Sequence, residues 1–151
     1  MLIRPVTKEE RLQSAQLLTI ESGDLTISAA DDAIHCDYTL QIGAEGTDGP
    51  AISITDCDEG LEAAALHVAS GDIRIRASDD CLNAANSDLS GFDFSMDISG
   101  GTISAYTTDG DGFDSNGSMT ISGGTPPEKP DGGTPPERLD NAAEPPEPGN
   151  L

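Results

Sequence analysis

Four short acidic turns recur along the chain, and carboxylates repeated in this way could bind hard divalent cations. The turns read Asp31-Asp32-Ala33-Ile34-His35, Asp58-Glu59-Gly60-Leu61-Glu62, Asp79-Asp80-Cys81-Leu82-Asn83 and Gly110-Asp111-Gly112-Phe113-Asp114. Their central acidic residues are spaced by 27, 21 and 31 residues. Calcium takes about 6–8 oxygen ligands from carboxylates, amides and carbonyls. We therefore predict calcium at these turns.

The candidate ligands are the acidic and amide side chains of the turns. They are Asp31, Asp32, Asp58, Glu59, Glu62, Asp79, Asp80, Asn83, Asp109, Asp111 and Asp114. Any single Asp here could simply form a turn, but turns alone would use Asn and Gly as freely. The run from Asp109 to Asp114 is no EF-hand, because Asp114 stands where that loop needs glycine.

The elements that must position these turns are short strands. The segment Ser22–His35 aligns without a gap to Ser70–Asn83, and apolar residues alternate with polar ones on both sides of each turn. Alternation at this length predicts strands with one buried face. A unit of about 21 residues cannot bury its own apolar face, so stacked units are expected. The sequence therefore predicts an all-β, right-handed parallel β-helix of about four to five turns over residues 18–124; a β-sandwich is the rival.

Stacking has an electrostatic consequence for the acidic turns. Equivalent residues in adjacent turns would lie about 4.8 Å apart. Two like charges at that distance repel by about 3.5 kcal/mol at an effective dielectric constant near 20, and by about 0.9 kcal/mol in bulk water. The carboxylates must then be well solvated, partly protonated, or share bound cations.

Composition excludes several other classes of function. The chain has 28 acidic and 7 basic residues and a net charge of -21, which argues against nucleic-acid binding. No apolar stretch approaches the roughly 20 residues of a membrane span, and the first residues do not read as a signal peptide. Cys36, Cys57 and Cys81 are expected as small buried core residues, and His35 and His67 as surface residues, although His35 shares the slot of Glu62.

The flanks differ from the repeats. Residues 1–17 contain good helix formers and predict a possible short helical cap. Gly-Gly-Thr-Pro-Pro-Glu occurs at residues 123–128 and again at 132–137, and residues 125–151 predict a disordered tail rich in Pro, Gly and Glu. Open ends of a solenoid could pair with a second copy of the chain, so self-association is possible.

The four turns, in this order, resemble those of bacterial carbohydrate-binding domain-containing proteins. These are calcium-binding parallel β-helix modules of the clostridial cellulose- and pectin-binding type. The resemblance covers roughly residues 18–124 and implies calcium at the acidic corners. It also implies binding of a pectin- or cellulose-like polysaccharide at the cell surface or outside the cell. The family is usually longer at both ends, so a truncated copy is expected, and Cys81 stands where the family usually has glycine.

Three functions are consistent with these sequence features. The first is a non-catalytic, calcium-binding polysaccharide-binding module. The second is a pectin-degrading enzyme on the same fold, for which Asp79, Asp80, Arg74 and Arg76 are the only candidate groups; outward strand positions explain both arginines, so no catalytic residue is predicted. The third is a purely structural calcium-binding solenoid.

Overall fold

The computed structural model describes residues 12–14 and 16–125, which form strands and turns only. The strands are β1 (Leu12–Ser14), β2 (Leu17–Ile20), β3 (Asp24–Ser28), β4 (Ile34–Ile42), β5 (Ala51–Asp56), β6 (Leu61–Val68), β7 (Asp72–Ala77), β8 (Leu82–Ala84), β9 (Ser95–Ile98), β10 (Thr102–Thr107), β11 (Phe113–Ser115) and β12 (Ser118–Ile121). Every strand pairing is parallel, as the stacked repeats predict.

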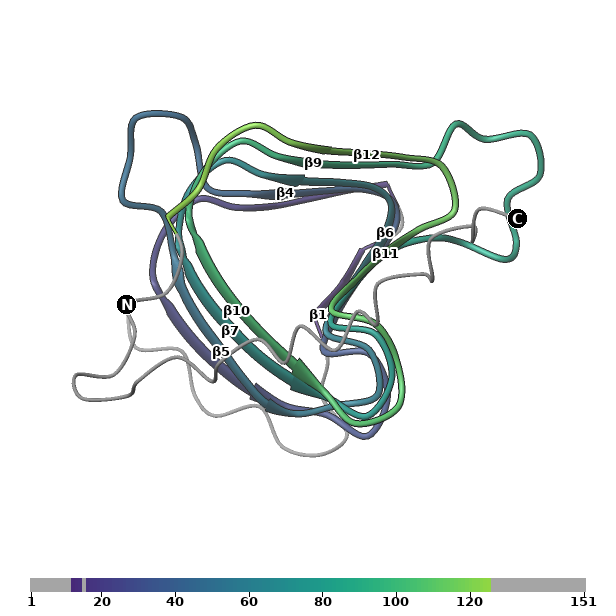
Figure 1. Cartoon of the computed structure of the whole chain (residues 1–151), viewed down its shortest axis with the longest axis horizontal. Helices are drawn as coiled ribbons and strands as arrows, with labels where there is room; N and C mark the ends of the chain where they lie inside the picture. The colour runs from purple at the N-terminus through teal and green to yellow at the C-terminus, as the bar shows by residue number, and fades with distance from the viewer. Residues whose placement is uncertain (1–11, 15, 126–151) are drawn as a thin grey trace, which may run out of the picture.

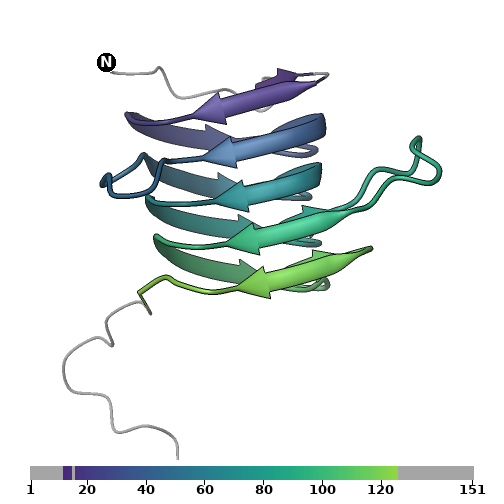
Figure 2. The ribbon, with the colours of Figure 1, turned by 90° about the horizontal axis from the view of Figure 1, so that it is seen from above.

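The coil has a triangular cross-section with three walls (Figure 1). The arginine face consists of β3, β5, β7 and β10. The ladder face consists of β1, the first halves of β4 and β6, β8 and β11, and the third face of β2, the second halves of β4 and β6, β9 and β12. The turns stack as a right-handed coil of about four turns (Figure 2), which confirms the predicted β-helix and excludes the sandwich.

The pairing register follows the spacing of the acidic turns. Ile34 pairs with Leu61, Leu61 with Leu82, and Leu82 with Phe113. The three offsets are the 27, 21 and 31 residues seen in the sequence. Each repeat is therefore one full turn, and the extra residues of the longer turns leave the ladder as loops.

Alternation along the strands builds the interior. On β7, Ile73 and Ile75 are almost completely buried, and Arg74 and Arg76 between them are exposed. Equivalent inward positions of successive turns stack on one another, so each wall contributes columns of Ile, Leu, Ala and Met to one core. The three cysteines are also buried and free, as expected.

The N-terminal boundary differs from the prediction. Leu12–Ser14 and Leu17–Ile20 are strands, so the described part of the proposed helical cap is not helical and the solenoid starts before residue 18. Leu12 pairs with Ile34 and Ser14 with Cys36. Pairing with the otherwise bare edge of β4 outweighs the helix propensity of this short segment. Residues 1–11 and the predicted tail from residue 126 onward lie outside the described residues.

The C-terminal end of the coil exposes apolar side chains. Met119 and Ile121, which stack on Met96 and Ile98, are 42% and 60% exposed. Self-association through this end remains a prediction. In the described part of the chain, no helix has the length and apolar character needed to cross a membrane.

Candidate metal centre

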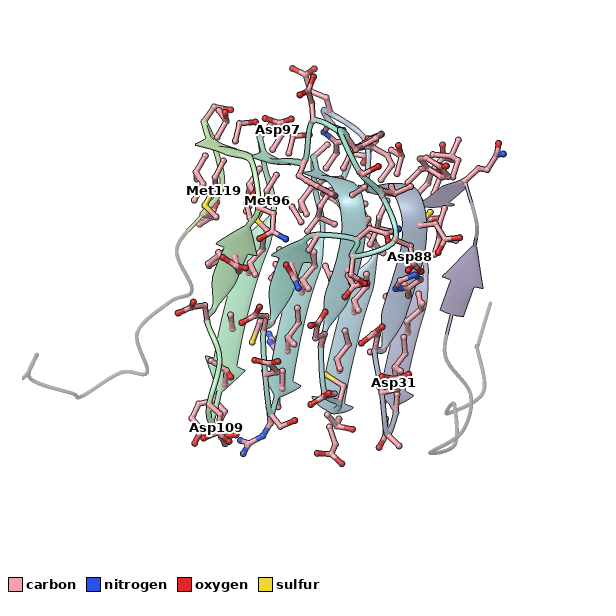
Figure 3. The ribbon with its side chains drawn as sticks, turned by 90° about the vertical axis from the view of Figure 1, so that its right-hand side faces the viewer. Asp31, Asp88, Met96, Asp97, Asp109 and Met119 are labelled. Carbon is pink, nitrogen blue, oxygen red and sulfur yellow. The ribbon has the colours of Figure 1, made fainter. Side chains whose placement is uncertain are left out.

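The acidic turns stack in register along one edge of the coil, between the arginine face and the ladder face. The amide of Gly60 donates to the carbonyl of Asp80 at 3.0 Å, and the amide of Cys81 donates to the carbonyl of Asp111 at 2.9 Å. Asp31 and Asp109 mark the two ends of this edge in Figure 3. The predicted alignment of the acidic corners is therefore confirmed.

One group of side chains, which we call the His35 pocket, gathers where this edge meets the ladder face. Its members are Asp32, His35, Glu59, Glu62 and Asn83. Nδ1 of His35 lies 2.9 Å from Oε1 of Glu62 and 3.3 Å from Oδ2 of Asp32. The three side chains are only 14–17% exposed. One ligand atom from each of the three lies within 4.8 Å of the others, and no other trio of His, Cys, Asp or Glu does so among the described residues.

Strand geometry accounts for this arrangement. His35 pairs with Glu62, and Glu62 pairs with Asn83, so all three project outward from one column of the ladder face. Asp37 lies two residues after His35, where the register of β4 shifts between Cys36 and Thr39, and its Oδ1 lies 2.9 Å from Nε2 of His35. That contact fixes the orientation of the imidazole ring.

A long loop is attached to β4 beside the His35 pocket. Residues 85–94 leave the coil between β8 and β9 and project from it (Figure 2). Nδ2 of Asn86 donates to the carbonyl of Asp37 at 2.9 Å, and the rings of Phe92 and Tyr38 meet edge to face at 6.0 Å. The loop is thus attached at Asp37 and Tyr38, and Asp37 is the residue that contacts Nε2 of His35.

Two acidic side chains of the pocket, Glu59 and Glu62, lie close enough to be hydrogen-bonded to each other. Partial burial, together with the hydrogen bond and the charge of Glu62, raises the pKa of Glu59 to about 8. Nδ2 of Asn83 donates to Oε2 of Glu59 at 3.2 Å and opposes this shift. The carboxyl group of Glu59 is therefore protonated more readily in the folded protein than a free glutamate would be.

A second group lies farther along the edge and is more exposed. This Asp79 row consists of Asp58, Asp79, Asp80, Asp109 and Asp111. The charge of Asp80 is the largest cause of the raised pKa of Asp79, and the other three carboxylates contribute to it. Three carboxylates of the row accept hydrogen bonds: Oδ1 of Asp80 from the amide of Asp111 at 2.7 Å, Oδ1 of Asp58 from Ser78 at 2.7 Å, and Oδ2 of Asp109 from Thr108 at 3.3 Å.

The structure thus divides the predicted ligands between the His35 pocket and the Asp79 row, with Asp31 and Asp114 outside both groups. Asp32, Glu59, Glu62 and Asn83 are in the His35 pocket, and five others form the Asp79 row. Asp31 is exposed at the first turn, and Asp114 pairs with Asn83 on the last. The sequence prediction left out His35 and Asp37. Its expectation that His35 is a surface residue is wrong, since the side chain is 15% exposed; the slot that His35 shares with Glu62 was the available signal.

The described cations lie on another wall. Arg74 and Arg76 are the only Lys or Arg residues of the described ranges, and both project from β7. The guanidinium carbon of Arg76 lies 4.7 Å from the ring centroid of Tyr106, which is 54% exposed. A groove of about 650 Å³ has Arg74, Arg76, Tyr106, Ser53 and Ser104 in its lining.

Comparison with protein-family models, with curated proteins and with solved structures gives no match. The resemblance to bacterial carbohydrate-binding modules therefore remains an expectation from the sequence.

Proposed function

We propose that this solenoid is a non-catalytic module that binds an acidic polysaccharide on its arginine face, with calcium bound along the Asp79 row. Pectin-like chains, whose sugars carry carboxylates, suit this face better than neutral cellulose. A polysaccharide-binding module of this kind would act at the cell surface or outside the cell.

The observation that carries the proposal is that both cations of the described residues, Arg74 and Arg76, lie on one wall of an otherwise acidic protein. Arg74 is already paired with Oδ2 of Asp72 at 3.1 Å, whereas the guanidinium of Arg76 lies over the ring of Tyr106. Arg74 and Arg76 lie two residues apart on β7, which puts their Cα atoms about 6.6 Å apart along the strand. Guanidinium groups bind carboxylates through paired, charge-assisted hydrogen bonds. Hydroxyl groups of Ser53 and Ser104 line the same groove, and Tyr106 supplies an aromatic surface for a sugar ring.

Continuity between the arginine face and the acidic edge supports a role for calcium. A hollow of about 110 Å³ has Arg76, Tyr106, Asp56 and Ser78 in its lining. Ser78 donates to Asp58 of the Asp79 row. A sugar carboxylate held by Arg76 could therefore also reach a calcium ion at the edge, since calcium accepts carboxylates from protein and ligand alike.

Binding to polygalacturonate, measured by affinity electrophoresis with calcium and with EDTA, tests the proposal. We expect retention of the chain by polygalacturonate and little retention by cellulose. Arg76→Gln should weaken retention at least several-fold, whereas His67→Gln on the third face should not. Equal retention of the Arg76 variant and the wild type would refute the assigned face.

The same incubation tests the alternative activity. Cleavage would release unsaturated or reducing sugar ends, and we expect none. Retention that is absent in every buffer, combined with calcium binding, would favour the purely structural solenoid.

A further inference from the structure

We propose that Asp32, His35 and Glu62 form a site for a first-row divalent transition ion, represented here by zinc, rather than for calcium. The site is separate from the calcium and polysaccharide sites proposed above and does not depend on them.

The orientation of the imidazole points to a ligand nitrogen. A carboxylate can only accept, so the 2.9 Å contact with Asp37 places the ring proton on Nε2 of His35. In the neutral ring Nδ1 then carries a lone pair, directed toward two carboxylates. A carboxylate that holds the far nitrogen of a histidine is the usual support of a metal-binding imidazole.

The contacts of Nδ1 do not have the geometry of hydrogen bonds. Nδ1 is buried and makes no hydrogen bond with a described residue, although Oε1 of Glu62 is only 2.9 Å away. An imidazolium ion paired with the carboxylates is the alternative, and its Nδ1–H would point at one of these oxygens. Three electron-pair donors whose ligand atoms lie within 4.8 Å of one another fit a cation in their midst.

A second, independent observation lies on the other side of Glu62. Asn83 is 7% exposed, and its Oδ1 is buried and accepts no hydrogen bond from a described residue. A buried carbonyl oxygen without a hydrogen bond lowers the stability of the folded state by about 1–3 kcal/mol. In the strand register Glu62 thus lies between His35 and Asn83, and each of these two residues has a buried side-chain atom without a hydrogen bond from a described residue.

The donor set and its spacing select the class of ion. Calcium and magnesium take oxygen ligands, whereas imidazole suits zinc and its neighbours in the first transition row. Around zinc, with bonds of about 2.0–2.1 Å in a tetrahedron, ligand atoms lie about 3.3 Å apart. The contact of Nδ1 with Asp32, at 3.3 Å, equals that spacing, and the contact with Glu62, at 2.9 Å, is slightly shorter.

Titration of the chelator-treated full chain with CoCl2, followed by visible absorption, tests the site. We expect one cobalt ion per chain, with absorption bands of a low-coordinate, nitrogen-ligated ion. His35→Gln should lower the affinity at least ten-fold. His67→Gln is the matched control, because Nδ1 of His67 also lies 3.3 Å from a carboxylate, that of Asp97. The His67 side chain is 36% exposed, and among the described residues it does not form a three-ligand group with a second carboxylate. An unchanged titration for the His35 variant would overturn the proposal.

Two further measurements do not depend on the folding of that variant. Asp37→Asn should weaken cobalt binding by about 10–100-fold, the usual effect of losing such a support. Zinc binding by the wild type, measured by calorimetry, should persist in a hundred-fold excess of CaCl2. Displacement of zinc by calcium, or no zinc binding at all, would mean that His35 is only an ion-paired imidazolium. Arg76→Gln should keep full zinc affinity, so failure of the polysaccharide proposal and failure of this one are distinguishable.

Discussion

The ladder face carries two columns of side chains on the same backbone, one facing inward and one facing outward. The inward column consists of Ile34, Leu61, Leu82 and Phe113, and the outward column of His35, Glu62, Asn83 and Asp114. Each inward residue precedes its outward neighbour in the sequence. Spacing, register and strand partners are therefore the same for both columns, and only the surroundings differ.

The difference shows what stacking does to each kind of side chain. Close repetition is favourable inside, because every apolar residue loses water to the turns above and below it. Outside, the same spacing brings carboxylates together, and repulsion grows with burial because fewer water molecules screen it. The inward column therefore stabilises the fold. The contribution of the outward column to stability depends on protons or cations that offset the repulsion between its carboxylates.

The largest expected effect is a difference in the free energy of unfolding between variants of two adjacent residues, Leu61 and Glu62. Leu61 is completely buried, so Leu61→Ala should lower the free energy of unfolding by about 2–5 kcal/mol. Glu62→Gln removes a charge that repels Glu59, so in EDTA it should leave stability unchanged or raise it. Urea denaturation of both variants measures this. A loss for the Glu62 variant as large as that for Leu61→Ala would break the distinction between the two columns.

Bound ions should produce the next largest effect. A ligand at 100 times its dissociation constant stabilises the native state by about 2.7 kcal/mol, which raises Tm by on the order of 10 °C for a domain of this size. We expect zinc to raise the Tm of the wild type but not that of Glu62→Gln. Calcium should raise the Tm of both, and its effect should fall in Asp79→Asn. Melting curves with each ion and with EDTA measure these differences, and the same response of both variants to both ions would contradict two distinct sites.

The course of the coil could be predicted from the sequence because its signal is repeated and local. Alternation in segments such as Ile73–Ala77 predicts the strands, and the offsets between the acidic turns are the offsets of the pairing register. The segment at Leu12 was misjudged, because its strand depends on the free edge of β4, which local propensity does not reveal.

The candidate ligands were predicted as a set, but their division into two groups was not. Burial of Glu59 and Glu62 depends on which turns of the coil neighbour them, and local sequence does not reveal this. His35 could have been included through the slot that it shares with Glu62. The role of Asp37 follows from the two-residue spacing on β4, which requires the strand to continue past His35.

A smaller effect should appear when the pH changes in the absence of metal. The pKa of Glu59 is raised from 4.5 to about 8 in the folded protein, so the native state binds more protons than the unfolded state between these values. Stability should therefore fall as the pH rises from about 5 to 8, which is opposite to the trend for an ion-paired carboxylate. Urea midpoints in EDTA measure it, and Glu59→Gln should flatten the slope; a rise of wild-type stability over this range would contradict the raised pKa of Glu59.

The smallest effect is expected at the far end of the acidic edge. Asp109 is exposed, and its Oδ2 meets Thr108 at a long 3.3 Å. Water and salt screen its charge, so Asp109→Asn should change the free energy of unfolding by no more than about 0.5 kcal/mol. Any gain should disappear in 0.5 M NaCl, where the screening length is about 4 Å. Urea denaturation at two salt concentrations measures this. A change above about 1 kcal/mol that persists in salt would mean that the whole edge behaves like the His35 pocket, because only poorly screened charges survive such conditions.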